Sequence, residues 1–179
     1  KLERIEDLAF SGTALAGSLI LPEGLKFVTG FTGTKITSVN FPSTLEEIGE
    51  YAFNGCTSLM VEVNFPESLK TIRQSAFNNS AISGNLSLPH NLETIEYGAF
   101  AGCSNLTGSL VVPDKVKEIG SNSFSSCGFN GTLSLPDGLD GILQIMGVDS
   151  QSIVEKATAE GVNLNGENLV ESLMNTVVT

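Results

Sequence analysis

The sequence has few positive charges, and this shortage argues against two classes of partner. Nine Lys and Arg residues stand against twenty Asp and Glu residues in a chain of 179, which gives a formal net charge of −11 at pH 7. Such a chain repels the phosphate backbone of nucleic acids and the anionic surfaces of membranes. No apolar run approaches the roughly 20 residues that span a bilayer. We therefore predict neither nucleic-acid binding nor a membrane span in this sequence.

Residue patterns typical of catalytic and metal sites are also missing. The only histidine, His90, directly follows a proline in a predicted turn, and no Ser or Cys with a carboxylate is expected to converge on it. Residues 137–141, Asp-Gly-Leu-Asp-Gly, lack the alternating oxygen ligands and the final Glu of a calcium loop. No phosphate-binding loop is present. We predict a protein that is not an enzyme and that uses no metal or cofactor.

The composition is that of a folded protein, with 41% hydrophobic and 16% charged residues. The chain opens with KLERIEDLAF, which has neither an initiator Met nor the character of a signal peptide. Because an apolar repeat position follows Lys1 at once, we expect a mature or excised fragment of a longer protein.

One sequence unit recurs along most of the chain, and its prolines mark it. The six prolines are spaced by 20, 24, 23, 24 and 23 residues, and apolar residues follow each of them at fixed offsets. A period of 23 to 24 falls in the range of leucine-rich repeats. One such unit buries too few apolar side chains to stand alone, so neighbouring units must stack as a solenoid. The prolines are Pro22, Pro42, Pro66, Pro89, Pro113 and Pro136.

The residues before each proline alternate as in a strand. In the triplet 110–112 the outer residues point inward and Val111 points outward. We expect the equivalent triplets of all coils to stack as one parallel sheet, which each proline ends by removing a backbone donor. A glycine precedes the strand in four coils, where a bend or bulge suits it. The half that runs from Leu-x-x-Ile to Phe is expected to form the opposite wall, as turns and a second row of short strands.

The repeated phrases resemble a known family. LEEIGEYAFNGCTSL, LETIEYGAFAGCSNL and VKEIGSNSFSSC, each followed by a strand and a proline, are similar to the BspA-like (Treponema-type) leucine-rich repeats. The form LTGSLVVP is most like the repeats of Bacteroides-type bacteria. The resemblance covers residues 1–142. It implies a leucine-rich-repeat solenoid with parallel strands on a concave face, a secreted or cell-surface location, and adhesion to host extracellular proteins.

Two regions depart from the pattern. The coil that begins after Pro22 has six residues from Leu25 to Phe31 where other coils have eight, and it lacks the glycine before the strand. This deletion is either tolerated on the outer wall or forms a local kink that shapes a binding spot. After residue 142 the period changes, and two amphipathic stretches lie in 143–179. We predict a helical cap on the last coil there, with the start of a further domain as the alternative.

All three cysteines fall at one repeat position. Cys56, Cys103 and Cys127 each follow a repeat phenylalanine by three residues, and Thr13 and Ser80 occupy the same position in other coils. Because Ser and Thr replace Cys at this position in other coils, we predict that the position serves packing and is neither a metal ligand nor a nucleophile. Cysteines in adjacent coils would lie about 4.8 Å apart, but their parallel Cβ directions disfavour a disulfide. We predict free, buried thiols.

The outward strand positions are the candidate binding surface. They are small, polar and nearly uncharged, and they carry no aromatic ring for stacking on a sugar. We predict a protein-binding, adhesion-type module that presents this face. Two other functions remain open: a structural spacer that displays another domain, or a glycan-binding module. The face itself could also be only a solvated surface with no ligand. The oligomeric state does not follow from the sequence. The candidate residues are Ile20, Asn40, Glu62, Asn64, Asn85, Ser87, Val111 and Ser134.

Overall fold

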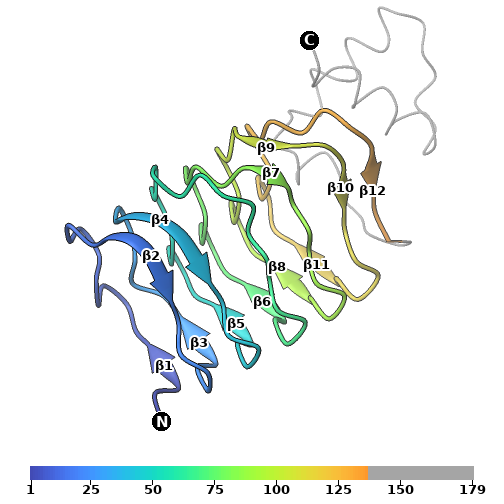
Figure 1. The fold of residues 1–179 in the computed structure, drawn as a ribbon. Coiled ribbons are helices and arrows are strands. Elements are labelled where there is room, and N and C mark those ends of the chain that lie inside the picture. Colours follow the sequence, from blue (N-terminus) through green and yellow to red (C-terminus); the bar gives the residue numbers. More distant parts are fainter. Residues whose placement is uncertain (137–179) are drawn as a thin grey trace, which may run out of the picture.

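The protein is a solenoid of stacked coils, seen in a computed structural model that describes residues 1–136 (Figure 1). We number the coils by the proline that ends each: coil 1 is 1–22, coil 2 is 23–42, coil 3 is 43–66, coil 4 is 67–89, coil 5 is 90–113 and coil 6 is 114–136. The predicted helical cap at 143–179 and the Gly-rich segment 137–141 lie outside the described residues.

One wall of the solenoid is a continuous parallel sheet of six two-residue strands. The last residue of each of its strands in coils 2 to 6 lies six residues after a proline, so every coil reaches this wall with the same length of chain. Equal path lengths keep the backbone donors and acceptors of adjacent coils in register. We call this wall the continuous sheet. In order its strands are β1 (Arg4–Ile5), β3 (Phe27–Val28), β5 (Glu47–Ile48), β6 (Thr71–Ile72), β8 (Thr94–Ile95) and β11 (Glu118–Ile119).

The residues before the prolines form the opposite wall, which we call the pre-proline wall. Its strands pair only two at a time, so the prediction of one parallel sheet across these triplets is wrong. An isolated bridge joins Asn64 to Ser87. The three pairs are β2 (Ala16–Ile20) with β4 (Lys35–Asn40), β7 (Gly84–Asn85) with β9 (Leu106–Thr107), and β10 (Leu110–Val111) with β12 (Leu133–Ser134).

Unequal chain lengths explain why this wall is broken. From the repeat phenylalanine to the next proline the chain takes 12, 11, 13, 12, 13 and 12 residues in coils 1 to 6. Equivalent residues of adjacent coils therefore fall out of register along this wall, and backbone pairing that starts in register is soon interrupted. Between coils 1 and 2 the register shifts between Gly17 and Ser18, opposite the unpaired Thr37 of β4, and Gly17 has φ of +83°. The predicted bend at the pre-strand glycine is confirmed there and at Gly84 and Gly108, which have φ of +80° and +75°.

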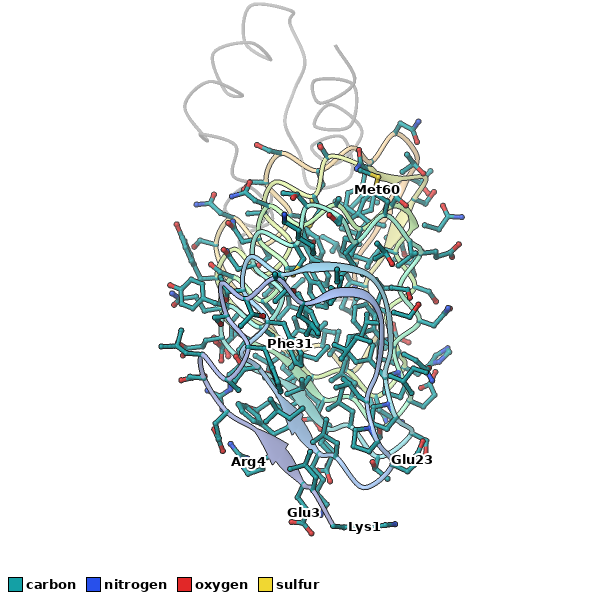
Figure 2. The ribbon with its side chains drawn as sticks, turned by 60° about the vertical axis from the view of Figure 1, so that its left-hand side comes forward. Lys1, Glu3, Arg4, Glu23, Phe31 and Met60 are labelled. Atoms are coloured by element: carbon teal, nitrogen blue, oxygen red, sulfur yellow. The ribbon has the colours of Figure 1, made fainter. Side chains whose placement is uncertain are left out.

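A column of phenylalanine rings runs through the core along the stacking direction. Consecutive rings lie 5.1 to 5.6 Å apart between centroids and are nearly parallel. Figure 2 shows Phe31 inside its coil, whereas Arg4 and Glu23 point outward. Burying one such ring contributes about 1.5–3 kcal/mol, so the column is a main source of cohesion between coils. It comprises Phe10, Phe31, Phe53, Phe77, Phe100 and Phe124.

Candidate protein-binding surface

The outward row of the pre-proline wall is exposed, as the alternation of the strands predicts. The aliphatic side chains of Ile20 and Val111 expose 76% and 56% of their surface. The residues on either side of each outward position point into the core or lie partly buried. The role of this row in binding stays a prediction. The exposed members are Ile20, Asn40, Asn64, Ser87, Val111 and Ser134, with Glu62 and Asn85 beside them.

Backbone pairing divides the row into three pairs. Ile20 pairs with Asn40, Asn64 with Ser87, and Val111 with Ser134. Within residues 1–136 no backbone pairing joins Asn40 to Asn64 or Ser87 to Val111. The row is therefore interrupted, and no backbone ladder holds Asn40 beside Asn64.

The interruption between coils 4 and 5 opens a hollow of about 360 Å³. Asn85 pairs with Thr107, but one residue then leads to Ser87 while three lead to Val111. The two extra residues of coil 5, Gly108 and Ser109, carry its chain out of register, and the walls separate beyond them. The hollow brings together three of the predicted binding residues, Asn85, Ser87 and Val111. Its full lining is Asn85, Leu86, Ser87, Leu88, His90, Val111 and Pro113.

The hollow has an apolar floor and a polar rim. Leu86 and Leu88 line the hollow and are buried, while Val111 is exposed at one side. At one end the ring of His90 lies 3.2 Å from a carboxylate oxygen of Glu67. A hollow of this kind holds an apolar side chain and offers polar groups to the backbone that carries it.

The Asn85 side chain at the rim lies close against Gly108 of the next coil. Its side-chain oxygen lies over Gly108, at a place that a Cβ atom would occupy. Gly108 has φ of +75°, and its N–H donates to the side-chain oxygen of Asn130 at 2.9 Å. Gly108 therefore serves both the turn and the close approach of the Asn85 side chain.

Sequence reasoning did not find the hollow itself. It placed His90 in a turn and treated the leucines of coil 4 only as core. The signal was present in the chain length between Phe100 and Pro113, which is one residue longer than the same segment of coil 4. A difference of one residue also separates coils 3 and 4 and coils 5 and 6, which stay paired at Asn64–Ser87 and at Val111–Ser134. These lengths therefore predict an irregular wall but not the place where it opens.

The cysteine position is structural, as predicted. All three cysteines are free; Cys56 and Cys103 are buried and Cys127 is half-buried. Burial raises the pKa of the Cys103 thiol to about 11, and burial also raises the pKa of Cys56 and Cys127. A thiol with a raised pKa is a poor nucleophile at neutral pH.

The described residues offer few other sites. Across 1–136 no three His, Cys, Asp or Glu side chains gather as ligands for a metal ion. The search for membrane-crossing helices, limited to the same residues, finds none that is long and apolar enough.

Comparison with known families identifies the repeat. A model described as "BspA type Leucine rich repeat region" matches residues 27–146 with six copies. A comparison with curated protein sequences finds no match.

Solved structures resemble the chain over most of its length. A leucine-rich repeat protein from Bacteroides ovatus ATCC 8483 is 30% identical, with a TM-score of 0.60 over 67% of this chain and 34% of that protein. The Treponema pallidum leucine-rich repeat protein is 24% identical, with a TM-score of 0.59 over 83% and 84% of the two chains. The pneumococcal vaccine antigen PcpA is 23% identical, with a TM-score of 0.52 over 75% and 43%. The chain thus spans about a third of the length of the Bacteroides protein.

Proposed function

Because the chain belongs to the BspA-type leucine-rich repeat family, we propose that it is a non-enzymatic protein-binding module, secreted or displayed on a cell surface. The observation that carries this proposal is the hollow between coils 4 and 5, where Asn85, Ser87 and Val111 meet around an apolar floor. A structural spacer needs no such opening in its wall. The surface location is supported by the family and by the likeness to a pneumococcal vaccine antigen.

The partner that suits the hollow is a protein segment with an apolar side chain. Val111 and the buried leucines match an aliphatic or aromatic group, and Ser87 and Asn85 provide donors and acceptors for a peptide backbone. No Phe, Tyr or Trp side chain of residues 1–136 lines the hollow, so it does not provide the stacking platform that sugars favour. Host extracellular proteins are the proposed class of partner.

The test is a binding assay of the purified chain on immobilised extracellular-matrix proteins by surface plasmon resonance. For any protein that binds, Val111→Arg and Ser87→Arg are expected to weaken binding at least tenfold, because a bulky charge fills the hollow. The matched control is Glu118→Arg, on the continuous sheet, which should leave binding unchanged. Equal effects of all three variants would reject the hollow as the contact, and failure to bind any such protein would favour the spacer.

A further inference from the structure

The deletion in coil 2 removes one corner of the solenoid. In every other coil three residues join the end of the continuous sheet to the small residue before the core phenylalanine, and we call the second and third of them the corner. In coil 2 only Thr29 follows the strand, and Gly30 already occupies the position of the small residue. The carbonyl of Gly30 accepts a hydrogen bond from the N–H of Phe10 at 2.8 Å, as the carbonyl of Ala52 does from Phe31. The two-residue corners are 7–8, 50–51, 74–75, 97–98 and 121–122, and coil 2 has none.

The missing corner leaves a hollow of about 280 Å³ between coils 1 and 3, which we call the corner slot. Stacked strands are about 4.8 Å apart, so the corners of coils 1 and 3 are separated by roughly 10 Å, the room of one strand. The slot is lined by Asp7, Leu8, Ser11, Thr29, Gly30, Thr32, Glu50 and Tyr51.

Backbone groups on both sides of the corner slot lack their regular partners. In coils 3 to 5 the N–H of the second corner residue donates to the carbonyl of the first corner residue in the next coil, as from Tyr51 to Gln74 at 3.0 Å and from Ser75 to Tyr97 at 2.9 Å. For Leu8 the acceptor would belong to the missing corner, and no described carbonyl replaces it.

The opposite side of the slot shows the same deficit. The carbonyl of Glu50 receives no backbone N–H from coil 2 and accepts the hydroxyl of Thr29 at 2.7 Å instead. A carbonyl oxygen has two lone pairs, so this group can accept a second hydrogen bond. The hydroxyl oxygen of Ser11, which also lines the slot, is buried without a partner among the described residues. An extended peptide can satisfy these groups with its own carbonyl and N–H.

The side chains that line the corner slot carry negative charge only. Among residues 1–136 neither Asp7 nor Glu50 takes part in an ion pair, and no cationic side chain lines the slot. Two arginines, Arg4 and Arg73, line a neighbouring hollow together with these carboxylates, but they already pair with Glu6 and Glu47. A basic side chain of a ligand can therefore pair with Asp7 and Glu50 from the side of the slot.

The side walls of the slot are apolar. Leu8 is 76% exposed on one side, and Tyr51 is 43% exposed on the other, where its hydroxyl accepts a hydrogen bond from Gln74 at 2.7 Å. This bond holds the tyrosine ring beside the slot, where it can stack on a guanidinium or ammonium group.

We propose that the corner slot binds a short extended peptide of a partner protein. The peptide backbone takes the place of the two missing residues, with its carbonyl on the N–H of Leu8 and its N–H on the carbonyl of Glu50. A Lys or Arg side chain of the peptide lies between the carboxylates of Asp7 and Glu50. This site is separate from the hollow on the pre-proline wall, and either can be present without the other.

The test is a titration of the isotope-labelled chain with three probes, followed by amide NMR. The first probe is the blocked pentapeptide Gly-Val-Arg-Val-Gly, the second has Glu in place of Arg, and the third is ethylguanidinium. The Arg peptide is expected to shift the amides of Leu8, Gly30 and Tyr51 saturably, and to bind at least tenfold more tightly than the Glu peptide. No saturable shift at these residues, or equal shifts with ethylguanidinium, would overturn the proposal.

Two variants separate the backbone and charge parts of the site. Inserting Glu-Tyr between Thr29 and Gly30 restores the corner and should abolish binding, with an otherwise native amide spectrum as the check of folding. Asp7→Asn with Glu50→Gln should weaken binding by about three- to tenfold, the effect of losing two exposed ion pairs. Glu118→Gln, a carboxylate on a distant coil, is the matched control. Undiminished binding by a folded insertion variant or by the double variant would overturn the proposal.

Discussion

The Sγ of Cys103 donates a hydrogen bond to the carbonyl of Phe77 at 3.1 Å, so a thiol of coil 5 contacts the aromatic column one coil earlier. The same bond recurs from Cys56 to Phe31 at 3.3 Å and from Cys127 to Phe100 at 3.2 Å. This position needs a small side chain that can donate to a buried carbonyl, which Ser and Thr also can.

The buried thiols predict a loss of stability at alkaline pH. The pKa of Cys103 is about 11 in the folded protein because burial penalises the thiolate, whereas an exposed cysteine ionises near 8.5. Between these values the unfolded chain releases a proton that the folded chain keeps, so the free energy of unfolding falls as pH rises. The fall is about 1.4 kcal/mol per pH unit for this group. Urea unfolding at pH 8, 9.5 and 10.5 measures it.

Cys103→Ser is the control for the thiol prediction, since Ser80 occupies the same position in coil 4. This variant should lose less stability than the parent over the same pH range, because serine does not ionise there. Parallel pH profiles for the two proteins would contradict the assignment of the effect to Cys103.

The phenylalanine column predicts a graded response to truncation. Phe77 is fully buried, and its ring lies 5.3 Å from that of Phe53 and 5.4 Å from that of Phe100. Phe77→Ala should lower the free energy of unfolding by about 3–5 kcal/mol, through lost burial and a cavity. Phe10 is 41% exposed at the first coil, and Phe10→Ala should cost less than half as much. Denaturant titration compares the two, and equal losses would argue against the column as the source of cohesion.

From the position of Arg73 we predict weak, salt-dependent ion pairing that links three coils. Its side chain in coil 4 pairs with Glu47 in coil 3 and lies 4.0 Å from Glu96 in coil 5. The hydrogen bond to Glu47 raises the pKa of Arg73, but the side chain is 41% exposed and solvent screens the pair. A double-mutant cycle of Arg73→Gln and Glu47→Gln should give a coupling below about 1 kcal/mol that shrinks in 1 M salt. A coupling above 2 kcal/mol, unchanged by salt, would show a desolvated pair instead.

From two glycines that directly follow strands of the continuous sheet, Gly49 after β5 and Gly120 after β11, we predict unequal costs for the same substitution. A Cβ at Gly120 would collide with the backbone of Glu96 and Tyr97, which cannot move without breaking the ladder. A Cβ at Gly49 would meet side chains instead, the edge of the Phe27 ring at 2.7 Å and the Cβ of Thr29 at 2.9 Å, which can shift more readily than a paired backbone. Gly120→Ala should cost about 1–3 kcal/mol and Gly49→Ala less, by the overpacking that each demands. Thermal unfolding of both variants ranks them, and the reverse order would contradict the backbone clash.

The repeat architecture was predictable because each coil repeats the same burial pattern. Prolines at a nearly constant spacing placed the coils, and the alternation around Val111 correctly separated inward from outward side chains. The prediction of the main sheet on the pre-proline wall was wrong because it used side-chain pattern alone. A backbone ladder requires the same length of chain in every coil. Only the path from a proline to the next strand of the continuous sheet has a constant length.

The candidate sites were predictable only in part. Asn85, Ser87 and Val111 were expected on one face, but a hollow depends on how much chain each coil inserts between fixed points. The short coil 2 was recognised as a departure, with a binding spot as one alternative. The consequence for Leu8 and Glu50 follows only from the coil-to-coil hydrogen bonds, which the structure provides.

The continuous sheet gives the solenoid one stiff side and one compliant side. Six strands joined without a gap resist elongation, whereas the interrupted pre-proline wall can widen where coils are not hydrogen-bonded. Bending should therefore open the pre-proline wall rather than the sheet, at the hollow between coils 4 and 5 and also between coils 2 and 3, where no strand pairing crosses this wall within residues 1–136. Deuterium uptake at the amides of 86–88 should be faster than at Thr94 and Ile95, and the reverse would exclude such an opening. A partner bound in the hollow would thus hold coils 4 and 5 apart on the pre-proline wall and fix the curvature of the solenoid.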